Sequence, residues 1–257
     1  MVNAQKWLDK NYPKNRRKEI TELDISEKNL QETLDLSNFV NLEELNCSEN
    51  QLTSLNLDNC SKLKKLDCSD NQLTELDLSN CNQLYDINCS ENGIEDIKFP
   101  YRTEQLTRLI IGCNNFSNQD LSFLNHLVNL KYLYLADNNF EGSLEFLKNM
   151  NKLEDLDISR TDIDSGLEYL SDSVKDFYCF VALDGEVITE NEYGCKVIHD
   201  LLVREGELNI YKPIKNFPQK LKEYKQKIAK EKARELLKDE FQGKEQTIQE
   251  LKEKTKN

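Results

Sequence analysis

The sequence predicts an α/β solenoid in which short parallel strands stack into one sheet and a helix lies at each end. Three observations predict this fold. Similar stretches recur about every 21 residues, apolar residues alternate within them as on strands, and the apolar spacing becomes helical near both ends of the chain. The composition, 38% hydrophobic and 32% charged over 257 residues, suits an elongated shape with much surface per residue.

Residues 1–19 are predicted to form a short N-terminal capping helix. Trp7 and Leu8, with Tyr12, are the apolar residues of this stretch, and the helix is expected to end before Pro13. We favour a cap that covers the open core of the first coil, and a partner-binding helix is the alternative. The N-terminal segment lacks the apolar core of a secretory signal.

Residues 20–182 are predicted to form an array of about eight coils. LNCSENQLTSLNLDNC, which begins at Leu45, is followed 21 residues later by LDCSDNQLTELDLSNC. In the L-x-L motif the two apolar side chains face one side of a strand, so Leu45 and Cys47 point inward and Asn46 points outward. The equivalent central positions are Leu23, Leu45, Leu66, Ile87, Leu109, Leu133, Leu156 and Phe177.

An asparagine follows each strand in the middle of the array. Its amide carries donors and an acceptor, so it can satisfy backbone groups that the turn leaves without partners. The predicted structural ladder is Asn50, Asn71, Asn92, Asn114 and Asn138, and it is interrupted at Lys28, Thr161 and Ala182 near the ends.

The eight cysteines are interpreted as free thiols, most of them in the core. Six recur at inward positions of the coils, where a small apolar side chain fits: Cys47, Cys60, Cys68, Cys81, Cys89 and Cys179. No close ligand cluster such as C-x-x-C indicates a metal site. Cys113 is expected to face outward as an accessible thiol, and Cys195 lies outside the array.

The wall opposite the strands is expected to change near residue 116, from extended segments to short helical turns, because the apolar spacing changes from two to three or four. Residues 183–217 are predicted to form a C-terminal cap. Residues 218–257 are predicted to form a charged amphipathic helix or a weak coiled coil, with a solvated helix and an interaction helix as the two alternatives.

Charge and motifs limit the function. The net charge of −13 argues against general nucleic-acid binding; residues 1–214 carry −18 and residues 215–257 carry +5. No stretch is long and apolar enough to span a bilayer, and we expect a cytoplasmic location. Catalytic motifs are not found, and His126 is expected to be structural. We therefore expect no enzyme activity, no cofactor and no metal.

The outward face of the predicted sheet is the candidate binding site. Its first four coils are polar and mostly acidic, whereas coils five to eight add the tyrosine and arginine residues that are frequent at binding hot spots. Tyrosine also suits strands by propensity, which is the alternative explanation. The predicted protein-binding residues are Arg108, Ile110, Tyr132, Tyr134, Asp155, Asp157 and Tyr178, with Asp137 and Arg160 beside them.

The stretches LEELNCSEN, LKKLDCSDN and LKYLYLADN resemble the leucine-rich repeat family over about residues 20–182. This resemblance implies a curved, right-handed solenoid that binds protein partners on the concave face of a parallel sheet. The wording NAQKWLDKNYP, ITELDIS and LEELNCSENQLTSLNL is similar to a group of fungal intracellular members. The resemblance suggests a protein-interaction scaffold, with self-association possible through the C-terminal helix; a regulatory subunit of a kinase or phosphatase complex is the alternative.

Overall fold

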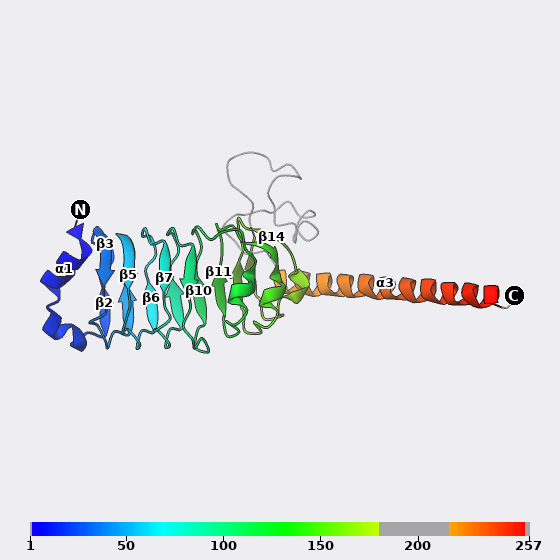
Figure 1. Ribbon diagram of the computed structural model, residues 1–257, viewed down its shortest axis with the longest axis horizontal. Coiled ribbons are helices and arrows are strands. Elements are labelled where there is room, and N and C mark those ends of the chain that lie inside the picture. Colours follow the sequence, from blue (N-terminus) through cyan, green and yellow to red (C-terminus); the bar gives the residue numbers. More distant parts are fainter. Residues whose placement is uncertain (1, 180–215, 255–257) are drawn as a thin grey trace, which may run out of the picture.

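The computed structural model describes residues 2–179 and 216–254 and confirms the predicted solenoid (Figure 1). Eight parallel strands of three residues each form one long sheet, in the chain order of the coils. We number the coils 1 to 8 after these strands. The strands are β2 (Glu22–Asp24), β4 (Glu44–Asn46), β6 (Lys65–Asp67), β8 (Asp86–Asn88), β10 (Arg108–Ile110), β11 (Tyr132–Tyr134), β13 (Asp155–Asp157) and β15 (Asp176–Tyr178).

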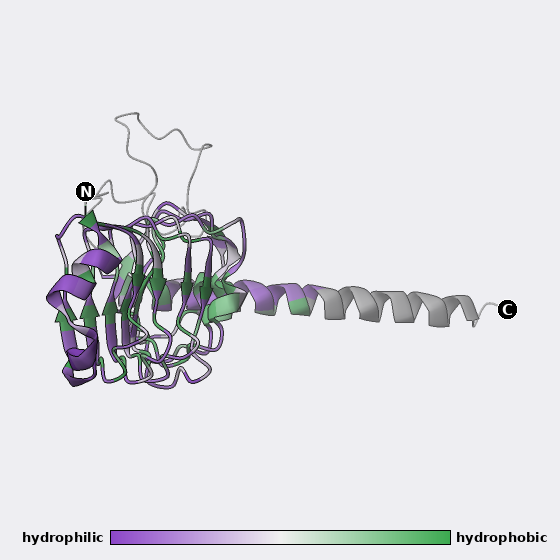
Figure 2. Cartoon of the chain, turned by 60° about the vertical axis from the view of Figure 1, so that its left-hand side comes forward, coloured by the Kyte–Doolittle hydropathy of each residue, from purple (hydrophilic) through white to green (hydrophobic). Residues whose placement is uncertain are grey.

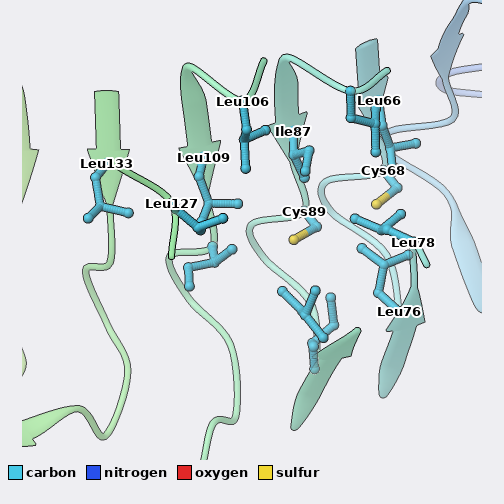
Figure 3. Close-up of a cluster of buried hydrophobic side chains, with 14 of the residues drawn as sticks. Leu66, Cys68, Leu76, Leu78, Ile87, Cys89, Leu106, Leu109, Leu127 and Leu133 are labelled. Carbon is cyan, nitrogen blue, oxygen red and sulfur yellow. The ribbon is translucent and has the colours of Figure 1, made fainter. Parts of the chain in front are cut away.

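The register of this sheet places every predicted central residue opposite its equivalent in the next coil. Leu45 pairs with Leu23 on one side and with Leu66 on the other, and the same register continues to Phe177. All eight central residues are buried, and Figure 3 shows the side chains of Leu66 and Ile87 in the interior with those of Cys68 and Cys89. All eight predicted strand positions are therefore confirmed.

The N-terminal end of the core is covered by β1 (Val2–Asn3), α1 (Ala4–Asn11) and the 3-10 helix η1 (Lys14–Glu19). Asn3 caps α1 by accepting a hydrogen bond from the Lys6 backbone N–H at 2.9 Å, and Leu8 is fully buried. Arg17 is also fully buried: it donates to the Tyr12 carbonyl at 2.9 Å and pairs with Asp9. Sequence reasoning missed this arginine, because a basic run such as KNRRK normally lies in solvent.

The wall behind the sheet changes as predicted. In the first four coils it is extended, with β3 (Leu30–Asp35), β5 (Gln51–Asn56), β7 (Glu75–Asp77) and β9 (Asp96–Lys98). From coil 5 onward it contains the 3-10 turns η2 (Leu121–Leu124), η3 (Leu144–Leu147) and η4 (Leu167–Tyr169). A second extended pair, β12 (Glu141–Ser143) with β14 (Asp162–Ser165), was not predicted. Hydrophobic and hydrophilic residues alternate along the coils (Figure 2).

Helix α3 (Phe217–Lys254) begins against the last coil and extends away from the array (Figure 1). Phe217 and Leu221 are buried, and the Phe217 ring stacks on that of Phe177 with the ring centroids 4.5 Å apart. Lys225 donates to the Leu170 carbonyl at 2.6 Å. The start of α3 therefore closes the C-terminal end of the core. The predicted cap in residues 183–217 lies outside the described residues, except for its last two positions.

The asparagine ladder is present, and the cysteines follow the prediction with one exception. Within the described part of the chain, Cys47, Cys60, Cys68, Cys81 and Cys89 are buried free thiols, and Cys113 is an exposed one. Cys179, however, is disulfide-bonded, so the prediction that every thiol is free is wrong for this residue. A recurring inward position indicates burial, but it carries no information on whether the sulfur is oxidised. Cys195 lies outside the described residues.

Candidate functional site

The candidate site lies on the outward face of the long sheet, here called the sheet face. On each strand the middle residue is buried and the two flanking residues are at least partly accessible. Because the strands are in register, the flanking residues form two straight columns. The first column contains Arg108, Tyr132, Asp155 and Asp176, and the second contains Ile110, Tyr134, Asp157 and Tyr178.

The structure thus brings all seven predicted binding residues to one surface, on strands β10, β11, β13 and β15. Asp137 and Arg160 lie at the turns that leave these strands, where they pair with each other. That they bind a partner stays a prediction. Asp176, which sequence reasoning did not include in the site, completes the first column and is exposed. The repeat spacing could have predicted this position, because it aligns Asp176 with Asp155 on the neighbouring strand.

We call the six residues on coils 6 to 8 the tyrosine–aspartate grid. It consists of Tyr132, Asp155 and Asp176 in one column and Tyr134, Asp157 and Tyr178 in the other. The Tyr132 side chain leaves 37% of the residue's surface exposed, the highest value for an aromatic residue on the sheet face. The grid therefore combines accessible aromatic surface with three carboxyl groups.

Asp155 is held within this grid by Tyr134. The Tyr134 Oη donates to Asp155 Oδ2 at 2.8 Å, whereas Asp155 Oδ1 is buried and has no hydrogen-bond partner among the described residues. Burial is the main cause that raises the pKa of Asp155, and the neighbouring Asp176 and Asp157 raise it further. Burial, followed by the Asp155 hydrogen bond, likewise raises the pKa of Tyr134.

Asp157 has a different local role. Its Oδ1 accepts a hydrogen bond from the Ser159 backbone N–H at 2.8 Å, which fixes the turn after the strand. The same turn recurs in earlier coils, where Asn46 and Asp67 accept from Ser48 and Ser69. Burial nevertheless raises the pKa of Asp157. This aspartate therefore contributes to the fold as well as to the charge of the sheet face.

The first half of the sheet face is acidic, and its cations are already paired. Lys65 Nζ lies 2.9 Å from Glu44 Oε1, and Arg108 Nη1 lies 3.0 Å from Asp86 Oδ1, each across neighbouring coils. Asp86 is a partner that sequence reasoning did not assign to Arg108. The ion pair with Asp86 thus orients the Arg108 side chain. Arg108 lies next to Tyr132, at the edge of the grid.

Chemistry other than binding has little support in the described residues. In residues 2–179 and 216–254, no group of three His, Cys, Asp or Glu side chains could hold a metal ion. His126 packs edge-on against Phe99, with the ring centroids 5.7 Å apart, and burial lowers its pKa. Burial raises the pKa of the Cys89 thiol to about 12, so this sulfur is a core side chain. No helix in the same ranges is long and apolar enough to cross a membrane.

Comparisons with known proteins identify the repeats. Residues 40–80 match the family described as Leucine Rich repeats (2 copies), and residues 129–150 match the family Leucine Rich Repeat. No curated protein sequence matches the chain. The family matches place the repeat motif in both halves of the array, before and after the change of the back wall.

Solved structures share this fold. An internalin (InlF) from Listeria monocytogenes str. 4b F2365 is 22% identical with a TM-score of 0.54, over 70% of this chain and 56% of the internalin chain. The leucine-rich repeat ectodomain of the plant membrane receptor kinase GASSHO1/SCHENGEN3 from Arabidopsis thaliana is 23% identical with a TM-score of 0.52, over 63% of this chain and 24% of that one. The chain thus spans only part of both proteins, and the likeness shows the fold alone.

Proposed function

We propose that this leucine-rich repeat protein is a non-catalytic scaffold that binds a protein partner through its sheet face. Leucine-rich repeats typically bind proteins, and solenoids use their extended surfaces for this purpose. The observation that carries the proposal is the alignment of Arg108, Tyr132, Tyr134 and Tyr178 on adjacent in-register strands. Tyrosine and arginine are enriched among the residues that dominate binding energies.

The shape of the site suits an extended segment or a loop of the partner. Neighbouring strands of a sheet lie about 4.8 Å apart, so coils 5 to 8 offer a strip roughly 15 Å long. Two residues per strand face outward along this strip. A strip of this width and length matches a short stretch of extended chain better than a deep small-molecule pocket.

The distal part of α3 supports a second contact, for recruitment or self-association. Its first turns pack on the array, whereas Leu236, farther along the helix, is 68% exposed and offers apolar surface for a contact. A chain truncated before Ala233 should lose any self-association in sedimentation velocity while the array stays folded. If the truncated chain and the full chain sediment in the same oligomeric state, this role is contradicted.

A regulatory subunit of a kinase or phosphatase complex is the alternative function. Two separate contact elements, the sheet face and the distal helix, suit a protein that joins a catalytic subunit to a target. Co-purification of a catalytic subunit with the full chain would favour this alternative. Capture of partners without any catalytic subunit would favour the simpler scaffold.

The cytoplasmic location and the fungal intracellular relationship are also proposals. The stretch NAQKWLDKNYP and the buried reduced thiols support them. The disulfide at Cys179 is more typical of an oxidising compartment. Counting reactive thiols in the denatured protein taken from its native cell decides this point, because a cytoplasmic protein should show Cys179 reduced.

The binding site is tested by removing its exposed aromatic rings. The double variant Tyr132→Ala/Tyr134→Ala should abolish capture of the main partner from a native extract, because it removes two of the three rings of the grid, including the exposed Tyr132. The matched control is Tyr101→Ala/Tyr169→Ala, which removes two exposed tyrosines away from the sheet face. Circular dichroism establishes that both variants are folded. Partner capture that survives the first variant would refute the site.

A further inference from the structure

The tyrosine–aspartate grid carries negative charge without a cation of its own. Its three tyrosines and three aspartates occupy adjacent strands in register. Two cations that lie next to it already have partners, since Arg160 pairs with Asp137 and Lys175 lies 2.5 Å from Glu154. Elsewhere on the sheet face Lys65 and Arg108 neutralise acids of the preceding coil. On coils 6 to 8, Arg160 and Lys175 also pair with acids of the preceding coil, but they lie beside the grid, and its own two columns contain no lysine or arginine.

From this pattern we propose that the grid binds a basic segment of the protein partner, and that an arginine or lysine side chain of that segment lies against the tyrosine rings and contacts Asp155. This inference rests on the proposed function and specifies the chemistry of the partner. Charge complementarity supports it, because the body of the chain, residues 1–214, carries a net charge of −18.

Asp155 is the residue that most needs such a partner. Its Oδ2 is occupied by the Tyr134 hydroxyl, but its buried Oδ1 has no hydrogen-bond partner in the described part of the chain. A buried carboxylate oxygen without a donor is unfavourable, and a guanidinium or ammonium group placed over the accessible part of Asp155 would stabilise its negative charge. The raised pKa of Asp155 agrees, because burial and nearby carboxylates act on it without a compensating cation.

The tyrosine rings supply the second half of the site. A cation over the face of an aromatic ring is attracted when it lies within about 6 Å of the ring centroid. The described residues contain such an arrangement on the sheet face: Lys65 Nζ lies 5.8 Å from the Tyr85 ring centroid and 2.9 Å from Glu44. The grid repeats the aromatic and carboxylate groups of that contact but lacks the lysine. A cation from a partner would complete it.

Arginine is the better fit of the two cations. Its planar guanidinium presents five donors and stacks on aromatic rings, so one side chain can cover Tyr132 or Tyr134 while its charge lies next to the partly accessible Asp155. Asp176 lies beside Asp155 in the same column and can accept a second donor. A segment in which arginines alternate with small residues would place successive arginines on the same side when extended.

The test is fluorescence polarisation with a labelled peptide in which three arginines alternate with glycines, at a fixed salt concentration. A peptide with citrulline in place of arginine keeps the shape and removes the charge. The arginine peptide should bind the full chain at least about tenfold more tightly than the citrulline peptide. Equal binding of the two peptides would overturn the proposal.

Variants locate the contact. Asp155→Asn retains an acceptor for Tyr134 and should weaken the arginine peptide about tenfold. Glu22→Gln removes the same charge from the same column at coil 1 and should change the affinity less than twofold. Asp176→Asn changes an exposed residue and should weaken binding to an intermediate extent. It tests the contact even if Asp155→Asn does not fold. Equal effects at Asp155 and Glu22 would mean that diffuse charge holds the peptide, which also overturns the proposal.

Two outcomes separate this inference from the proposed function. If the arginine peptide fails to bind while captured partners still need Tyr132 and Tyr134, only the basic segment is wrong. If captured partners ignore these tyrosines, the proposed function fails as well. If Asp155→Asn instead abolishes a dimer that truncation of α3 also abolishes, the basic helix of a second copy occupies the grid, and the proposal of a separate partner is overturned.

Discussion

Single amide side chains link neighbouring coils of the array. Asn71 Nδ2 donates to the Cys47 carbonyl of the preceding coil at 3.0 Å and to the Cys68 carbonyl of its own coil at 3.2 Å. Its Oδ1 accepts from the Leu52 backbone N–H at 2.9 Å. One residue therefore satisfies backbone groups on two coils, which explains why the sequence repeats asparagine and not a shorter polar residue.

The ladder weakens where the back wall changes. The Oδ1 atoms of Asn50, Asn71, Asn92 and Asn114 accept a hydrogen bond from a backbone N–H of the preceding coil. Asn138 Oδ1 is buried and has no such donor among the described residues. The sequence pattern treats these asparagines as equivalent, because it cannot show how the preceding coil presents its backbone. Coil 5 is the point at which that backbone turns from extended to 3-10.

Cys113 gives a prediction at this scale. Its thiol is exposed, but partial burial and the neighbouring Asp137 raise its pKa to about 11. The thiolate is the reactive form, so alkylation by iodoacetamide at pH 7 should be far slower than for an ordinary thiol. The rate should then rise about tenfold for each pH unit until the pH approaches the pKa. Mass spectrometry of the Cys113 peptide measures the rate.

Asp137→Asn is the matched change for this experiment. It removes the negative charge beside the sulfur and releases Arg160, so it should lower the pKa of Cys113 and accelerate alkylation at pH 8. Cys113→Ser defines the background from other thiols. A rate at pH 7 equal to that of a free cysteine, or no response to Asp137→Asn, would contradict the assigned environment.

At the scale of elements, the start of α3 should contribute strongly to stability. Phe217 is fully buried and stacks on Phe177, the central residue of the last strand. Phe217→Ala removes this ring from the end of the core and should lower the free energy of unfolding by about 3 kcal/mol. Urea unfolding followed by circular dichroism measures the loss.

Leu236→Ala is the control on the same helix. Leu236 is 68% exposed and lies beyond the array, so its replacement should change the free energy of unfolding by less than about 0.5 kcal/mol. Similar losses for the two variants would show that α3 stabilises the protein by its helicity and not by closing the core. An unchanged free energy of unfolding in Phe217→Ala would contradict the role of α3 as a cap.

Elements with a local repeat could be predicted from the sequence, whereas those that depend on distant contacts could not. The strands around Leu45 and Leu66 follow from alternation alone, and the turn at Leu121–Leu124 follows from the wider apolar spacing. Phe217 carries no local sign that it covers Phe177, because 40 positions separate the two residues. Likewise, periodicity placed Tyr134 and Asp155 on one face, but only side-chain geometry shows that one oxygen of Asp155 lacks a partner.

The whole molecule is a one-dimensional stack that is closed differently at its two ends. At one end α1 covers the first coil, and the buried Arg17 joins this helix to the turn that follows. At the other end α3 covers the last coil and continues outward (Figure 1). Each coil contacts only its neighbours, so such caps are needed to keep the terminal cores out of water. Between the caps, the outward strand residues of coils 5 to 8 are at least partly accessible in the described part of the chain.

Charge is distributed along this stack in a way that should oppose folding. In each of the first four coils, an acidic residue with a positive φ angle follows the strand of the long sheet. These residues are Glu27, Glu49, Asp70 and Glu91. Neighbouring strands are about 4.8 Å apart, so these carboxylates form a column of like charges. Exposed ion pairs such as Lys98–Asp77 offset little of this repulsion, because water and salt screen them.

Repulsion and ion pairing respond to salt in opposite directions, and we expect repulsion to dominate. Raising NaCl from about 20 mM to 300 mM shortens the screening distance from roughly 20 Å to about 6 Å and should increase the free energy of unfolding by about 1 kcal/mol. Urea titrations at several salt concentrations measure the trend. Glu49→Gln shortens the acidic column at an exposed position and should reduce the response to salt, whereas Lys62→Gln, which removes an exposed cation, should enlarge it. A free energy of unfolding that falls with salt would mean that the ion pairs between coils stabilise the array more than its net charge of −13 destabilises it.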